Sequence, residues 1–410
     1  MSFLLNLVLG STNPEELVVS TCKSASVLCA AGRVRRASTP VVSSKVVVGA
    51  ESTPASKVKC FFSDSEVAAA RELVGRQLGE MKVILMGDQE KDVDEDRARK
   101  LAKAAVSHNL AWSLASCVTE LELESCKNAA HVLANLIGRR DVVSKAFADH
   151  VVAKDGAVLE ALAGAYPENV AVALACGTIL KEAARHEVVA AAILRSPSVW
   201  LFLTDYVHLK NFDVAADAFD VVRTLLTKHK SLAATFIEDN YDLFFECFHR
   251  LLTSDNYVTC RESLRLLSDI LLDRANYATM ISYVASRDNL KIFMLLLRSK
   301  KQRIQLEAFH VFKVFVANPK KHPAVAKVLY QNKDKLLAFL ADFHGGDTDN
   351  DQFLEERHLI LDTLANLQPP PAEDDPEWTA LVDAALGGPG GPTTRLKRKQ
   401  GTNHRTTTNT

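Results

Sequence analysis

The feature that most constrains this chain is an apolar stripe that recurs at intervals close to 45 residues. Counted from Ala308, apolar residues follow at +3, +4, +7 and +8, which is the one-sided pattern of a 3.6-residue helix. The same pattern starts at Ser263, Ala218, Cys176 and Ala129, with successive intervals of 45, 45, 42 and 47 residues. One such unit cannot bury its apolar face alone, so neighbouring repeats must share a core.

The repeat interval predicts the fold class. HEAT and armadillo repeats have this period. We therefore expect an all-α, right-handed helical-repeat solenoid, a curved rod whose concave face can bind a folded partner. No segment of the sequence reads as a strand.

Composition narrows the classes of function. The 49 basic and 50 acidic residues give a net charge of -1, so no global field favours nucleic acid or an anionic membrane. No apolar run reaches the 18 or more residues of a membrane-spanning helix. The eight cysteines form no CxxC pair, which favours reduced core thiols over a metal site or disulfides. We expect a cytoplasmic protein.

Four regions are expected along the chain. They are an N-terminal helix (1–30), a disordered insertion rich in Ser, Thr and Val (31–62), the helical-repeat domain (63–368) and a largely disordered Pro/Gly/Thr-rich basic tail (369–410). The insertion could instead be the body of an organellar transit peptide, because it is rich in Ser and poor in acids. At the start of the repeat domain, Ser63 and Glu66 form a capping box for a helix that ends at Met86.

Within the insertion, Arg35-Arg36-Ala37-Ser38 has the form of a site for a basophilic kinase. Phosphorylation of Ser38 would add negative charge to a segment that is otherwise basic. Ser38 is therefore a candidate phosphorylation site. Chance matches to so short a pattern are common.

The sequence lacks the motifs of common enzymes. It contains no HExxH, GxxxxGK[ST] or GxSxG element. Asp347, Asp349 and Asp351 are spaced as in a calcium-binding EF-hand loop, but Gln352 stands where that loop needs Gly and His358 where it needs Glu. We expect no catalysis, no metal and no cofactor. The basic run 395–399 could be a nuclear import signal or a nucleic-acid tail, although a solvated basic end is the simpler interpretation.

Several segments carry a more specific resemblance. The longest is Glu307–Pro319, and shorter ones are Asn211–Ala215, Leu225–Lys230, Asn256–Thr259 and Leu271–Arg274. Together they resemble the Mo-twenty-five family, also called calcium-binding protein thirty-nine, and the likeness covers about three quarters of the chain. The resemblance implies a non-enzymatic cytosolic adaptor whose concave face binds a Sterile-twenty-type kinase or the STRAD pseudokinase. It also implies a pocket in the C-terminal repeats for a Trp-Glu-Phe tripeptide at the C-terminus of the pseudokinase.

The resemblance also assigns partner-binding residues. The groove positions are Phe212, Tyr257, Arg261, Arg274 and Tyr277, and the tripeptide pocket is assigned Lys291, Met294 and Gln331. Two of these depart from the family pattern. Tyr277 stands where the family has Phe, which should keep the aromatic contact. Gln331 stands where the family has Lys, which would remove a charge pair with the peptide carboxylate.

The residues themselves permit simpler interpretations. Tyr257 and Arg261 lie four residues apart, hence on one face of a helix, and Tyr and Arg are favoured in binding hot spots. They could equally be a rim tyrosine and a solvated arginine. Met294 could fill the core, and Phe212 could be a packed hydrophobic staple at a helix start.

Two other functions stay open. One is an armadillo-type cargo or transport adaptor, but the only tryptophans, Trp112, Trp200 and Trp378, do not follow the repeat period that such grooves use. The other is an RNA-binding helical-repeat protein, for which a neutral charge is unfavourable. A scaffold that binds a protein kinase is the main hypothesis.

Overall fold

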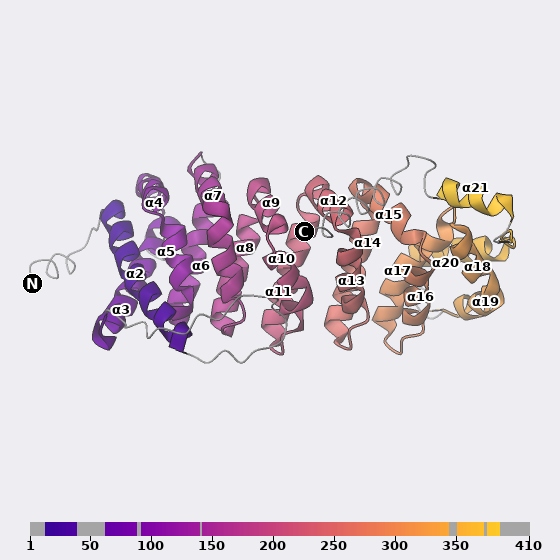
Figure 1. Ribbon diagram of the computed structural model, residues 1–410, viewed down its shortest axis with the longest axis horizontal. Helices are drawn as coiled ribbons and strands as arrows, with labels where there is room; N and C mark the ends of the chain where they lie inside the picture. Colours follow the sequence, from indigo (N-terminus) through magenta and orange to yellow (C-terminus); the bar gives the residue numbers. More distant parts are fainter. Residues whose placement is uncertain are drawn as a thin grey trace, which may run out of the picture. The chain divides into compact units, whose positions relative to one another are not determined.

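The computed structural model describes residues 13–38, 62–87, 92–139, 142–343, 351–372 and 375–385 (Figure 1). All regular structure within these ranges is helical, which confirms the all-α prediction. The chain divides into two compact units, unit 1 (Met1–Lys228) and unit 2 (His229–Thr410).

Unit 1 is built on a ladder of four helices, in which α3 packs on α6, α6 on α8 and α8 on α11 (Figure 1). The helices of the unit are α2 (Pro14–Ser38), α3 (Asp64–Met86), α4 (Glu95–Ser107), α5 (Leu110–Cys117), η1 (Val118–Glu120), α6 (Leu123–Gly138), α7 (Val142–Ala165), α8 (Val170–Ala183), α9 (Glu187–Arg195), α10 (Ser198–Thr204), η2 (Tyr206–His208) and α11 (Phe212–Thr227). The remaining helices pack against this ladder, as α7 does on α6 and α8.

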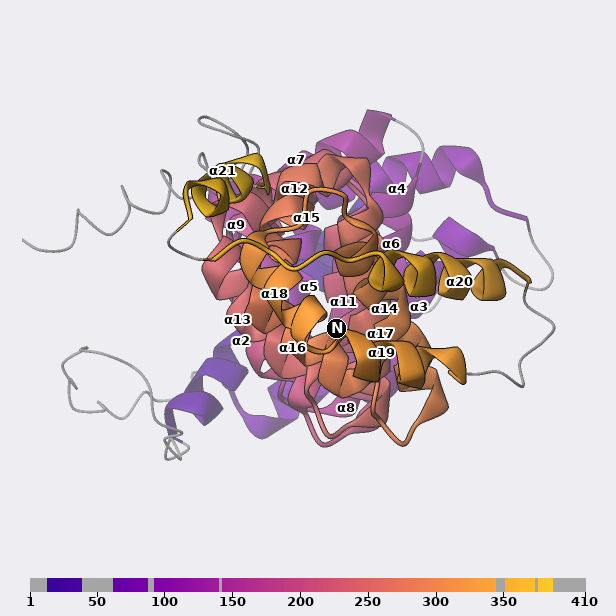
Figure 2. The ribbon, with the colours of Figure 1, turned by 90° about the vertical axis from the view of Figure 1, so that its right-hand side faces the viewer.

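Unit 2 repeats the arrangement with a ladder in which α14 packs on α17 and α17 on α20. Its helices are α12 (Lys230–Asp239), α13 (Tyr241–Leu252), α14 (Tyr257–Leu272), η3 (Arg274–Asn276), α15 (Tyr277–Val284), α16 (Arg287–Leu296), α17 (Gln302–Ala317), α18 (Pro323–Gln331), α19 (Lys333–Ala341), α20 (Asp351–Ala365) and α21 (Pro376–Ala385). Figure 2 faces the end of this unit and shows the extended segment that follows α20.

The apolar stripe forms the core of both units. Its members on α6, α8 and α11 are buried in unit 1, and those on α14 and α17 are buried in unit 2. Even Ser263, the polar member of the stripe, is fully buried, because its hydroxyl donates to the Thr259 carbonyl 2.6 Å away. The periodicity therefore identified core positions correctly in each repeat.

The boundaries of α3 follow from its sequence. Glu66 N–H donates to Ser63 Oγ at 3.3 Å, and Ser63 N–H donates to Glu66 Oε2 at 2.8 Å, so the predicted capping box is confirmed. The helix ends at Met86 because Gly87 adopts a φ of 74°, a region that favours glycine.

The predicted end of the first helix is wrong. We expected a disordered insertion from residue 31, but α2 continues to Ser38. Ala31 is buried, and Gly32 lies so close to Glu120 that a Cβ there would be 2.6 Å from Glu120 Oε1. This contact with a distant residue continues the helix where local composition suggested a break. The candidate phosphorylation motif ending at Ser38 thus lies in the last turns of a helix.

The described residues contain no single helix that is long and apolar enough to cross a membrane. One pair of helical segments, Glu187–Arg195 and Ser198–His208, reaches the required length only when both are counted across a 75° bend. The cysteines of the described ranges are all free, and those at 117, 126, 176, 247 and 260 are buried.

Candidate partner-binding site

The candidate site in unit 2 is an arginine–glutamate cluster between α14 and α17. Arg261 and Arg265 lie one turn apart on α14 and approach Glu307 of α17, with Nε to Oε1 distances of 3.6 and 3.9 Å. Glu262 takes part as well, because its Oε1 is 3.6 Å from Arg261 Nη1 and 3.5 Å from Arg265 Nη1. We call these four residues, Arg261, Glu262, Arg265 and Glu307, the arginine cluster.

The arginine cluster is held together mainly by charge, with a long hydrogen bond from Arg265 Nη1 to Glu262 Oε1 at 3.5 Å. Arg261 Nε is buried and has no hydrogen-bond partner among the described residues. Its distance to Glu307 is longer than the 2.7–2.9 Å of a strong charge-assisted hydrogen bond. A buried donor without an acceptor costs free energy. The Arg261 side chain as a whole is 32% exposed, so the rest of its guanidinium is accessible to an acceptor of a partner.

Glu307 sits in an environment that opposes its charge. Burial raises the pKa of the Glu307 carboxyl, although Arg265 and Arg261 act in the opposite direction. The two arginines therefore do not fully compensate the lost hydration of the carboxylate. The cluster carries an incompletely satisfied acid beside an incompletely satisfied base.

Tyr257 lies at the start of α14, one turn before Arg261. Asn256 caps the helix by accepting from the N–H groups of Val258 and Thr259, which fixes the direction in which the first turn leaves the loop. The Tyr257 ring is exposed, and Lys301 Nζ lies 5.2 Å from its centroid, within the range of a cation–π contact. Tyr257 and Arg261 thus share a helix face, as their spacing predicted.

The short helix η3 and the start of α15 hold the next two predicted residues. Asp273 accepts from the N–H of Ala275 at 2.9 Å and pairs with Lys230 at 2.6 Å, which anchors the turn. Arg274 and Tyr277 are exposed on this turn. Tyr277 also lines an apolar groove with the ends of α14, α17 and α20.

Phe212 belongs to unit 1, unlike the other predicted groove residues. It is the first residue of α11, and Asn211 caps that helix by accepting from Val214 N–H at 3.1 Å. With 57% of its surface exposed, Phe212 is not a packed staple. An exposed phenylalanine at a helix start is available for contact with another protein.

The residues assigned to the tripeptide pocket lie on neighbouring helices. Lys291 and Met294 are three residues apart on α16, which packs on α18, and Gln331 is the last residue of α18. Lys291 pairs with Asp288 at 2.9 Å, Met294 is half-buried, and Gln331 is exposed. Met294 therefore keeps some accessible surface for contact with a peptide.

Unit 1 contains a contrasting cluster around Asp217 on α11. Tyr166 donates its hydroxyl to Asp217 Oδ2 at 2.5 Å, and Lys181 of α8 pairs with Asp217 Oδ1. Gly177 on α8 makes room, because a Cβ there would overlap the Asp217 carboxylate. Burial and the neighbouring carboxylate of Asp217 raise the pKa of Tyr166, so Tyr166 stays protonated as a donor. We call these residues the Asp217 clamp.

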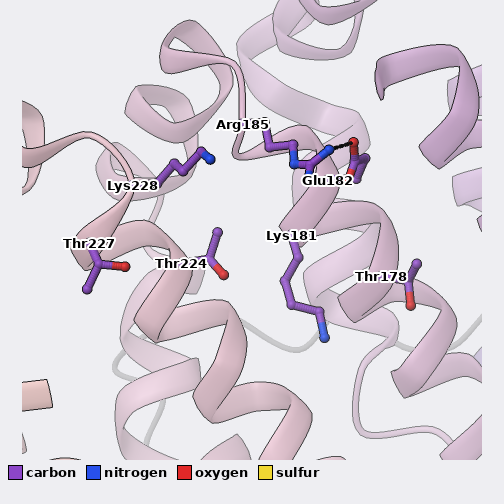
Figure 3. Close-up of a pocket in the computed structure, with 7 residues that line it drawn as sticks. All are labelled: Thr178, Lys181, Glu182, Arg185, Thr224, Thr227 and Lys228. Atoms are coloured by element: carbon purple, nitrogen blue, oxygen red, sulfur yellow. Dashed lines mark hydrogen bonds and ion pairs between the residues drawn. The ribbon is translucent and has the colours of Figure 1, made fainter. Parts of the chain in front are cut away.

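A shallow pocket between the ends of α8 and α11 adjoins the clamp (Figure 3). Its residues are Thr178, Lys181, Glu182, Arg185, Thr224, Thr227 and Lys228. The basic side chains of the pocket do not converge on one point (Figure 3). Arg185 forms an ion pair with Glu182 at 2.7 Å, and the side chains of Lys181 and Lys228 point in different directions. Cations at the C-terminal ends of helices are stabilised by the helix dipole, so this pocket needs no ligand to explain its charge.

Sequence reasoning missed the partners of Arg261. Arg265 follows Arg261 at i+4, a spacing that places both on one face, and this signal was available. Glu307 was noted only as part of a family segment. Its contact with α14 depends on repeat packing across 46 residues, which the sequence does not display.

The part of the chain that the structure describes contains no group of three or more His, Cys, Asp or Glu residues able to hold a metal ion. The EF-hand-like acids at 347 and 349 lie outside the described residues. Gln352 and His358, the two mismatches in that pattern, lie within α20.

Comparison with known proteins places these features in a family. The Mo25-like family matches residues 54–368. A human protein named calcium-binding protein 39-like is 39% identical over 305 residues, covering 74% of this chain and 90% of its own length. A Mo25-like protein of Schizosaccharomyces pombe is 38% identical and covers 72% of this chain and 89% of its own.

A relative from Arabidopsis thaliana, a putative MO25-like protein, is also 38% identical, over 72% of this chain and 85% of its own length. These relatives come from an animal, a fungus and a plant, and the residues matched by the family model include both ladders, the arginine cluster and the Asp217 clamp. This chain belongs to the Mo25-like family of scaffold proteins.

Proposed function

We propose that this protein is a non-enzymatic cytoplasmic scaffold that binds a Sterile-twenty-type kinase, or a STRAD-like pseudokinase, and activates it allosterically. The observation that carries the proposal is Arg261, whose side chain stays 32% exposed beside the exposed Tyr257 and pairs with Glu262 and Glu307 only at 3.6 Å. Arginine and tyrosine are enriched in the few interface residues that dominate binding. A carboxylate or carbonyl of the kinase would bind the accessible part of the Arg261 guanidinium, since the side chain as a whole is 32% exposed.

The arginine cluster supplies a pre-organised contact. Glu262 and Glu307 restrain the Arg261 side chain before a partner arrives, so less side-chain entropy is lost on binding. Arg274 and Tyr277 extend the same set of contacts along unit 2. Phe212 adds an exposed aromatic residue in unit 1.

Activation requires a preference between two states of the kinase. A scaffold that bound active and inactive conformations equally would shift nothing, however tight the complex. We propose that the arginine cluster recognises the active-like position of the regulatory helix of the kinase. Tripeptide recognition by Lys291 and Met294 would be altered where the partner depends on a positive charge at position 331, because this chain has Gln331.

The test uses the full chain and the catalytic domain of a Sterile-twenty-type kinase from the same organism. We expect saturable binding in calorimetry and a rise in the phosphorylation rate of a generic peptide substrate that saturates at the same scaffold concentration. Arg261→Ala should weaken binding by about 2 kcal/mol, roughly thirtyfold. Absence of binding by the wild-type chain to every such kinase would refute the proposal.

A matched control separates a specific contact from general loss of positive charge. Arg250 lies on α13 in the same unit, is exposed, and forms a surface pair with Glu246 at 2.9 Å. Arg250→Ala should leave kinase affinity within a factor of about two, since exposed pairs contribute little. Equal effects of both substitutions would point to a non-specific electrostatic attraction.

A further inference from the structure

The end of unit 2 carries an apolar groove with a volume of about 780 Å³. Its floor and sides come from α14, α15, α17 and α20, and one wall is formed by Ala384 and Ala385 of α21. Helix α21 lies beyond residue 368, where the match to the Mo25-like family ends. The groove therefore combines helices within the matched residues with one helix outside them.

The groove exposes large apolar side chains from three of its helices. Leu272, Tyr277 and Leu359 are 59%, 58% and 60% exposed although α21 is docked beside them. Large apolar residues gathered in one concave surface mark an interaction site. Helix α21 thus walls the groove without filling it.

The size of the groove fits a short helix. One turn of an α-helix with its side chains occupies about 500 Å³, from a diameter near 11 Å and a pitch of 5.4 Å. The groove therefore holds about one and a half turns. Recognition of this kind uses two apolar side chains spaced at i and i+3 or i+4.

The rim of the groove favours an acidic occupant. Lys313 is already paired with Glu356 at 2.7 Å, whereas Lys320 is exposed and has no ion pair among the described residues. The lining thus has an excess of one positive charge. This charge disfavours the chain's own tail as occupant, because residues 395–399 carry four basic side chains and no acid.

We propose that α14, α15, α17, α20 and α21 form a helix-binding groove that accepts a short amphipathic helix of a protein partner, with two apolar anchors beside Leu272 and Leu359 and a carboxylate on Lys320. The groove adjoins the proposed kinase-binding residues at Tyr277. It does not require that the kinase itself be the occupant.

The test is a selection from a phage-displayed library of helical 14-residue peptides on the full-length protein, with removal of phage that bind Leu359→Asp. We expect enriched peptides with two large apolar residues at i and i+3 or i+4 and one Asp or Glu. A synthetic consensus peptide should bind wild type at least tenfold more tightly than Leu359→Asp in fluorescence anisotropy. Failure to enrich any peptide that depends on Leu359 would overturn the proposal.

Charge reversal tests the contact with Lys320. Lys320→Glu should weaken the consensus peptide about tenfold, and a peptide with Lys in place of its acid should recover that loss on the variant. No recovery would overturn the assignment of the carboxylate. Leu123→Asp is the control, because Leu123 is 55% exposed but lies on α6 in unit 1, and it should leave peptide affinity unchanged.

The role of α21 is tested with Ala385→Asp, which puts a charge at the buried contact of α21 with the groove. We expect a three- to tenfold loss of peptide affinity with an unchanged thermal midpoint. Tighter peptide binding would instead show that α21 competes for the groove and would overturn its role as a wall. Kinase binding is measured on the same preparations, so intact kinase binding without peptide binding refutes this inference alone.

Discussion

Units 1 and 2 both place a carboxylate between neighbouring ladder helices, but its surroundings differ. In unit 1, Asp217 receives a hydrogen bond from Tyr166 at 2.5 Å and an ion pair from Lys181. In unit 2, Glu307 meets Arg261 and Arg265 only at 3.6 and 3.9 Å. The same position in the repeat thus holds a closed contact in one unit and an open one in the other.

The difference between these two carboxylate contacts shows how the same repeat position can contribute to stability in one unit and to binding in the other. A closed, buried hydrogen-bonded pair is costly to break because each partner is left desolvated. An open arginine keeps donors for another molecule, and its removal should cost the fold little. We therefore expect substitutions in the Asp217 clamp to affect stability, and substitutions in the arginine cluster to affect binding.

The largest expected effect is the loss of Asp217. Asp217→Ala leaves the Tyr166 hydroxyl and the Lys181 ammonium without their acceptor, and it should lower the free energy of unfolding by about 3 kcal/mol. Urea unfolding followed by tryptophan fluorescence suits this test, because Trp112 and Trp200 both lie in unit 1.

The control for this substitution is Asp220→Ala on the same helix. Asp220 is exposed, and its ion pair with Arg223 is long, at 4.0 Å. Loss of the Asp220 carboxylate should therefore change the free energy of unfolding by no more than about 0.5 kcal/mol. Similar losses for both variants would mean that the clamp is not a closed contact.

Gly177→Ala tests the clamp from the opposite side. The new methyl group would lie 2.7 Å from Asp217 Cγ and 3.1 Å from Tyr166 Oη, and the overlap should cost about 2 kcal/mol despite the better helix propensity of alanine. Gly164→Ala is the control, since a Cβ at that glycine has no neighbour within 4 Å. A neutral or stabilising Gly177→Ala would contradict the packing described for α8 and α11.

Tyr257→Ala tests the open cluster. Removal of the exposed ring should weaken kinase binding by about 1.5 kcal/mol, roughly tenfold, and change unfolding by less than about 0.5 kcal/mol. Tyr257→Phe keeps the ring that faces Lys301 and should retain most of the affinity. Calorimetric titration with the kinase and urea unfolding of the same samples give the two values.

The smallest expected effect concerns the acid of the cluster. The folded protein holds the Glu307 pKa above its ordinary value of 4.5, so it binds this proton more tightly than the unfolded chain does. Stability from this group is therefore greatest below pH 4.5 and is lost as the pH rises through the raised pKa. The free energy of unfolding of wild type minus that of Glu307→Gln should therefore decrease as the pH rises from 4.5 through the raised pKa of Glu307.

Urea unfolding followed by circular dichroism, from pH 4 to pH 7, measures this difference. A difference that rises with pH would show that the arginines stabilise the carboxylate more than burial opposes it. The contrast between a closed and an open cluster would then be weaker than the distances suggest.

Much of the fold could be predicted from the sequence because it depends on local rules. The stripe starting at Ala308 follows the helical period, and the start and end of α3 follow from Ser63 and Gly87. The extent of α2 could not be predicted, because it depends on packing of Ala31 and Gly32 near Glu120, almost 90 residues away.

The candidate site divides in the same way. The shared face of Tyr257 and Arg261 follows from their spacing. The lack of a hydrogen-bond partner for Arg261 Nε among the described residues does not, because it depends on the distance to Glu307 in the next packed repeat. The wall that α21 adds to the apolar groove depends on a chain path that no periodicity encodes.

The most direct test of the account measures Arg261→Ala and Asp217→Ala side by side, for kinase affinity and for unfolding free energy. We predict opposite effects of the two substitutions. Arg261→Ala should weaken kinase binding roughly thirtyfold and change the free energy of unfolding by less than about 0.5 kcal/mol. Asp217→Ala should lower the free energy of unfolding by about 3 kcal/mol and leave kinase affinity within about threefold, at a temperature where the variant is folded. If Arg261→Ala lost stability and kept its affinity, the arginine cluster would be a structural contact, and the proposed binding site would be wrong.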